Sequence, residues 1–174
     1  MKRIITALVQ DRSGVLNRLT GLMQRRQFNI ESISVGKTET EGISKMTFVV
    51  EIADSQKLEQ LTKQLHKQID VLKVSDITDK AIVARELALI KVVSNGHLIN
   101  EMKGIIEPFR ASIIDVSKDS LSIQVTGKPD KIEALIDLLR PYGIKEIART
   151  GMTAFLRGQQ PQVAELNSYS AMMK

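Results

Sequence analysis

The chain has 174 residues and no cysteine, which excludes disulfides, thiol catalysis and thiolate metal sites. Apolar residues make up 43% of it and charged residues 26%, a balance typical of a globular protein that buries a core. The net charge of +5 comes from 25 basic and 20 acidic residues that are interspersed, so no block of like charge points to a nucleic acid.

We expect no export signal at the amino terminus. Met1, Lys2 and Arg3 lead directly into the apolar run IITALV, which is too short for the apolar region of a secretory signal followed by a cleavage site. No stretch approaches the ~20 apolar residues of a membrane span. We therefore expect a cytoplasmic protein that does not enter a membrane.

The first half of the chain alternates between strand and helix patterns. Runs with apolar residues at every second position predict strands, and the turn-prone ETEG between two of them is typical of an antiparallel hairpin. Apolar residues at helical spacing predict two helices. The predicted strands are residues 3–9, 29–38, 43–53 and 70–77, and the predicted helices are residues 14–27 and a segment capped by Asp54.

The second half repeats this order of elements after a short charged segment. Pro129 stands at the first position of its last predicted helix, and Gly143 ends that helix. The predicted strands are residues 87–94, 111–117, 120–127 and 144–151, and the first helix spans residues 97–109.

The repeated order β-α-β-β-α-β predicts an α+β protein with two ferredoxin-like domains in tandem. Right-handed crossovers would place both helices of each domain on one face of a four-stranded antiparallel sheet. We expect domains at residues 1–78 and 85–157, a linker at 79–84 and a mobile tail at 158–174. The other sheet face and the edge strands need cover, so we expect at least a homodimer.

A glycine stands between the first predicted strand and helix, in the segment DRSGVL. If the helix begins near Gly14, the backbone N–H groups of Gly14, Val15 and Leu16 lack partners within the helix. The helix dipole favours an anion there, and glycine lacks the Cβ that would block a carboxylate. The alternative is that Ser13 caps the helix and Gly14 only eases the turn.

Longer phrases of the sequence carry a family resemblance. RIITALVQDRSGVLNRLTGLMQRRQFNIESISVG, with SKMTFVV on the third strand, resembles the amino-terminal ACT domain of the small regulatory subunits of acetolactate synthase (acetohydroxyacid synthase). RELALIKV, IIEPFRASIIDVS, KIEALIDLL and GIKEIARTG resemble the carboxy-terminal domain of that family. The resemblance covers residues 1–157 and identifies the chain as a family member.

The resemblance implies a regulatory role in branched-chain amino acid biosynthesis. Family members bind a branched-chain amino acid, most often valine, between two ACT domains. They activate a large catalytic subunit and make it sensitive to feedback inhibition. By this resemblance Gly14, Val15 and Leu16 offer backbone amides to the ligand carboxylate, and Asn29 and Ile30 come from the facing subunit.

Position 11 departs from the family pattern, because many members carry Asn where this chain has Asp11. The carboxylate of Asp11 either attracts the ligand ammonium or repels the ligand carboxylate. At ~4 Å and an effective dielectric constant of ~20, each interaction is about 4 kcal/mol before solvent screening. The sequence therefore leaves open which of valine, leucine and isoleucine is preferred.

No intrinsic catalytic or metal site is expected on this chain. The sequence contains no Gly-rich phosphate loop, paired carboxylates or nucleophile elbow. His66 and His97 lack a metal co-ligand three or four residues away. The resemblance implies that thiamine diphosphate, Mg and FAD belong to the large catalytic subunit, so this chain is a subunit of an enzyme rather than an enzyme itself.

Two other functions are compatible with such a fold. RNA recognition needs aromatic residues on the central strands, but RIITALV, LALIKVV and SLSIQVTG contain none and Phe48 stands alone. A free-standing amino-acid sensor acting on another enzyme or transporter would have the same ligand turn. Copurification with a large catalytic subunit would separate it from the regulatory subunit.

Overall fold

The computed structural model describes residues 1–94 and 98–158. They form two units, one made of Met1–Val83 with the described residues from Ala154 onward, and the other of Ala84–Thr153. His97 and residues 159–174 of the expected tail lie outside the described residues. No helix of the described part is long and apolar enough to cross a membrane.

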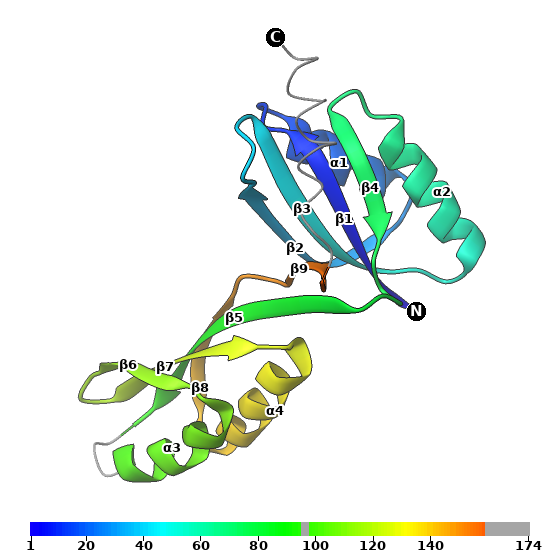
Figure 1. Cartoon of the computed structure of the whole chain (residues 1–174). Helices are drawn as coiled ribbons and strands as arrows, with labels where there is room; N and C mark the ends of the chain where they lie inside the picture. The colour runs from blue at the N-terminus through cyan, green and yellow to red at the C-terminus, as the bar shows by residue number, and fades with distance from the viewer. Residues whose placement is uncertain (95–97, 159–174) are drawn as a thin grey trace. The chain divides into compact units, whose positions relative to one another are not determined.

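Unit 1 contains a four-stranded antiparallel sheet with the strand order β2-β3-β1-β4. The central strands β1 and β3 are paired along their whole length, from Lys2 opposite Glu51 to Gln10 opposite Ile43. Helices α1 and α2 lie together against one face of this sheet (Figure 1). The elements are β1 (Lys2–Gln10), α1 (Val15–Arg25), β2 (Asn29–Lys37), β3 (Ile43–Glu51), α2 (Ser55–His66) and β4 (Val71–Asp76).

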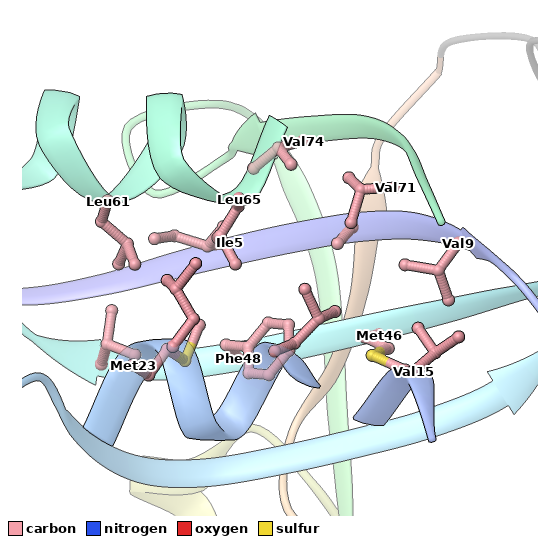
Figure 2. Close-up of a cluster of buried hydrophobic side chains, with 14 of the residues drawn as sticks. Ile5, Val9, Val15, Met23, Met46, Phe48, Leu61, Leu65, Val71 and Val74 are labelled. Carbon is pink, nitrogen blue, oxygen red and sulfur yellow. The ribbon is translucent and has the colours of Figure 1, made fainter. Parts of the chain in front are cut away.

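The core of unit 1 lies between this sheet and its two helices. Phe48 is fully buried at its centre, with Met23 of α1 and Leu61 of α2 pointing toward it (Figure 2). The side chain of Asp54 accepts a hydrogen bond of 2.8 Å from the N–H of Lys57, which confirms the predicted cap of α2. The apolar residues recur with a period of two in the strands and of 3.6 in the helices, and these periods determine which face of the sheet packs against which face of each helix.

The other face of the unit 1 sheet is partly covered by the chain itself. Thr47 and Val49 alternate with the core residues of β3, so they lie on that face, yet both are buried. Lys45 shares the face, and its Nζ lies 5.9 Å from the centre of the Phe155 ring. Burial lowers the pKa of Lys45. A partner subunit is therefore not the only cover available to this face.

Unit 2 repeats the arrangement with the strand order β6-β7-β5-β8, and β9 also pairs with β5. Its separate core includes Ile90, Met102, Ile123 and Leu135. The elements from β5 onward are β5 (Ile82–Val93), α3 (Ile99–Ile106), the 3₁₀ turn η1 (Glu107–Phe109), β6 (Ser112–Val116), β7 (Ser120–Gly127), α4 (Pro129–Leu139), the 3₁₀ turn η2 (Arg140–Tyr142), β8 (Ile144–Arg149) and β9 (Thr153–Leu156). The first two residues of β5 and the last three of β9 belong to unit 1.

The two matching strand orders confirm the predicted fold, an α+β protein with two ferredoxin-like sheets. Three local features differ from the prediction. β5 begins at Ile82, inside the segment expected as a linker, and β9 was not predicted. The predicted helix 97–109 is α-helical only to Ile106, because Pro108 has no N–H to continue it and the next turn is 3₁₀.

Candidate functional site

The turn between β1 and α1 has the geometry of a helix start without a side-chain cap. Gly14 is the N-cap residue, its φ is 82° in the left-handed region, and no side chain caps the helix. This geometry excludes Ser13 as the cap. Residues with a Cβ rarely adopt such a φ, so the backbone itself requires glycine here.

Backbone N–H groups remain available at this turn. The N–H of Val15 makes only a long hydrogen bond of 3.4 Å to the carbonyl of Arg12, and those of Gly14 and Leu16 have no acceptor in the described part of the chain. Gly14 and Leu16 are exposed, whereas Val15 is buried in the core cluster (Figure 2). Together with the helix dipole, these donors can bind a small anion such as a carboxylate.

Backbone hydrogen bonds hold the turn in place from two sides. The N–H of Asp11 donates to the carbonyl of Gly42 at 2.8 Å, which ties the turn to the loop between β2 and β3. The N–H of Arg12 donates to Gln10 at 2.9 Å. The side chain of Asp11 is exposed, so the structure brings four of the predicted site residues, Asp11, Gly14, Val15 and Leu16, into one solvent-accessible turn.

One charged residue of this turn is missing from the prediction. A Cβ placed on Gly14 would lie 3.2 Å from Nη1 of Arg18, so this guanidinium stands directly beside the turn. Its Nη2 donates to Oδ2 of Asp70 at 2.5 Å. Arg18 follows Gly14 by one helical turn within the phrase SGVLNR, and that spacing is the sequence signal that could have identified it.

Asn29 and Ile30 lie elsewhere in the same unit. Asn29 is opposite Glu51, which is opposite Lys2, so it stands at the end of the sheet remote from Gln10. The two ends of a nine-residue strand are roughly 26 Å apart. Asn29 is exposed on an edge strand and Ile30 is partly buried against the core. A single chain therefore does not bring them to the Gly14 turn.

The described residues contain no group of three or more His, Cys, Asp or Glu side chains that could hold a metal ion. The turn itself contains the charged residues Asp11 and Arg12, and Arg18 with its partner Asp70 lies beside it. The turn thus offers hydrogen-bond donors and charges of both signs, which is the chemistry that recognises a zwitterionic small molecule.

Comparisons with known proteins agree over nearly the whole chain. Residues 5–73 match the family model of the AHAS small subunit-like ACT domain, and residues 85–158 match that of the small subunit of acetolactate synthase. The acetolactate synthase small subunit of Bacillus subtilis is 64% identical over 170 residues, which is 98% of this chain and 99% of that protein. A probable acetolactate synthase small subunit of Archaeoglobus fulgidus is 51% identical over 160 residues, covering 92% of this chain and 99% of that protein.

A solved structure agrees with the fold as well. The crystal structure of the acetolactate synthase small subunit from Thermotoga maritima matches with a TM-score of 0.83 and 38% identity, covering 92% of this chain and 99% of that one. The unit 1 sheet with its two helices is therefore an ACT domain. At this level of identity and coverage, the chain belongs to the family of acetolactate synthase small subunits.

Proposed function

We propose that this chain regulates acetolactate synthase by binding a branched-chain amino acid, valine foremost, at the Gly14 turn. It activates the large catalytic subunit, and the bound amino acid reverses part of that activation as feedback inhibition. The observation that carries the proposal is the exposed turn with unpaired N–H groups and a glycine at φ 82°, in a member of this family.

The binding mode needs two copies of the chain. The N–H groups of Gly14, Val15 and Leu16 bind the ligand carboxylate, and Asp11 lies close enough to act on the ligand charges. Asn29 and Ile30 are at the remote end of the sheet, so only a second copy can supply them. The ligand then bridges two ACT domains and stabilises one geometry of their dimer.

Inhibition follows as a population shift. The amino acid favours one dimer geometry, and the catalytic subunit is more active with another. A ligand with a Kd of ~0.1 mM binds with about 5.5 kcal/mol in total. Only the difference in affinity between the two geometries moves the equilibrium, and a coupling of about 1 to 3 kcal/mol is typical. Such a coupling produces partial inhibition.

The reaction chemistry belongs to the large subunit under this proposal. That subunit holds thiamine diphosphate, Mg and FAD, and this chain contributes binding and allosteric coupling. Its partners are therefore the large catalytic subunit, a second copy of itself and the amino-acid effector. A small subunit that binds valine but fails to copurify with a large catalytic subunit would contradict this part of the proposal.

The test is calorimetric titration of the full chain with valine, leucine and isoleucine, with and without the catalytic subunit. Gly14→Asp adds a Cβ, a negative charge and backbone strain, since φ is 82°. Gly143→Asp is a matched control, because Gly143 has φ 81° and a Cβ there would also meet a side-chain atom at 3.2 Å, in Val93. We expect valine binding in the wild type and the control but not in Gly14→Asp. Binding that survives in Gly14→Asp would place the ligand elsewhere.

A further inference from the structure

Arg18 stands beside the Gly14 turn in a position to share its ligand. Its Nη1 would lie 3.2 Å from a Cβ on Gly14, and this is the space that glycine leaves open for the carboxylate. The side chain is 47% exposed, so solutes reach it. The guanidinium has five N–H donors, and the structure gives an acceptor to one Nη2–H, in Asp70.

Asp70 fixes Arg18 in this position. Its side chain is only 7% exposed, and its Oδ2 lies 2.5 Å from Nη2 of Arg18. Its backbone carbonyl accepts a hydrogen bond of 2.9 Å from the N–H of Gln10, the last residue of β1. A nearly buried carboxylate keeps its ion pair, because leaving either charge unpaired there is costly. Asp70, in the loop between α2 and β4, thus connects the end of β1 through its backbone and the first turn of α1 through its side chain.

We infer that Arg18 binds the carboxylate of the amino-acid ligand together with the amides of the Gly14 turn, and that Asp70 is the residue that positions it. The inference rests on the proposed function. It also accounts for a charge problem at the site: Asp11 brings a negative charge to the turn, and Arg18 opposes its repulsion of the ligand carboxylate. A ligand with a carboxylate fits this arrangement, since planar guanidinium groups match carboxylates.

A merely structural ion pair would affect all ligands alike, so the test compares two ligands that differ in the carboxylate. The full-length chain is titrated with valine and with valinamide, which lacks the negative charge. In Arg18→Gln we expect the affinity for valine to fall roughly tenfold or more, while the affinity for valinamide changes little. Arg18→Lys keeps the charge and should recover part of the loss.

Asp70→Asn tests the positioning role. It leaves Arg18 in the chain but weakens the ion pair that holds its side chain. The ratio of the affinity for valine to the affinity for valinamide should therefore decrease, as in Arg18→Gln, but by less. Arg149→Gln is the control, because Arg149 also pairs with a nearly buried carboxylate, that of Glu86, in unit 2 and away from the proposed site. The ratio should be unchanged in this control.

The outcomes separate this inference from the proposed function. If the wild-type chain binds valine and Arg18→Gln weakens both ligands equally, Arg18 is only a structural partner of Asp70 and the inference is overturned. If the wild-type chain and its complex with the catalytic subunit bind no valine, the proposed function fails and the inference fails with it. A valine-to-valinamide affinity ratio that decreases in Arg18→Gln and partly recovers in Arg18→Lys supports both the inference and the proposed function.

Discussion

At Gly14, the sequence and the structure each give a separate reason for the glycine. The sequence places it between a strand and a helix, which is local information and predicts an anion-binding turn. The structure adds a φ of 82°, which the sequence alone does not predict. A substitution there therefore has two expected effects, backbone strain of about 1 to 2 kcal/mol and, under the proposed function, an obstructed ligand site. This is why the Gly143 control matters to any test of binding.

Arg18 shows where prediction at the scale of one residue ends. Its partner Asp70 is 52 residues away in the sequence, and no local pattern pairs the two. Asn29 and Ile30 are predicted from the family resemblance to come from the facing subunit, and this stays a prediction because one chain keeps them at the far end of the sheet. Residues adjacent in sequence were predictable, and those that meet through the tertiary fold were not.

Asp76 gives unit 1 a stability that depends on pH. Burial alone would raise its pKa, but hydrogen bonds from Thr78 (Oγ1 at 2.6 Å, N at 3.0 Å) and from Arg3 Nε at 3.0 Å outweigh this and lower the pKa below the ordinary 3.8. A carboxyl with a depressed pKa stabilises the fold above its ordinary pKa. This contribution is lost as the pH falls through the depressed value.

We therefore expect Asp76→Asn to lower the free energy of unfolding by roughly 1 to 3 kcal/mol at pH 7. The difference from the wild type should shrink as the pH is lowered below 4, because Asp76 becomes protonated in the folded wild type while Asn does not titrate. Urea denaturation at pH 7, 4 and 3 measures it. A difference that stays constant over this range would show that the charge of Asp76 contributes nothing.

At the scale of elements, periodicity was sufficient for the two sheets and insufficient at their margins. β9 has the alternation of a strand, with Ala154 buried between the exposed Thr153 and Phe155, but it is only four residues long and follows the last expected strand. α3 ends early because one proline removes one N–H donor. Short segments carry too few periods to be separated from loops by pattern alone.

An ion-paired cluster joins three elements of unit 2. Arg149 of β8 donates from Nε and Nη2 to the carboxylate of Glu86 in β5, at 2.6 and 3.0 Å, and from Nη1 to Glu133 of α4 at 2.5 Å. The side chain of Glu86 is only 5% exposed. The hydrogen bonds to Glu86 raise the pKa of Arg149 further, although burial opposes them. Arg149 therefore stays charged at every accessible pH.

Arg149→Met should lower the free energy of unfolding by about 3 kcal/mol, because it leaves the Glu86 carboxylate buried without its partner. The double variant Arg149→Met with Glu86→Gln should recover much of this loss, since a neutral amide is less costly to bury than an unpaired charge. Urea midpoints of the wild type, Arg149→Met, Glu86→Gln and the double variant form the cycle. A double variant as unstable as Arg149→Met alone would show that the cost is lost packing of the arginine and not the unpaired charge.

At the scale of the whole molecule, the sequence predicted two repeated units because each half has its own apolar residues at strand and helix spacing, enough for its own core. The cores are separate clusters, one around Phe48 and one around Ile90. The predicted function came from the likeness of long phrases to a family, and not from the fold, which also serves unrelated functions. The proposed ligand site is not complete in a single chain, since two of its six residues, Asn29 and Ile30, are proposed to come from another copy.

The proposed regulation makes a quantitative prediction for the assembled enzyme. If valine and the catalytic subunit favour different geometries of the ACT dimer, each weakens the binding of the other by the same factor. A coupling of about 1 to 3 kcal/mol corresponds to a factor of roughly 5 to 150. Calorimetry of valine with the free chain and with the complex gives one ratio, and the affinity between the subunits with and without saturating valine gives the other.

The two ratios must agree, because they close one thermodynamic cycle. Gly14→Asp is the control in which valine should leave the affinity between the subunits unchanged, whereas Gly143→Asp should behave as the wild type. Inhibition by valine with both ratios equal to one would contradict the population shift. The ligand would then act on the turnover of the bound complex without favouring either geometry, since the reciprocity of binding free energies does not extend to kcat.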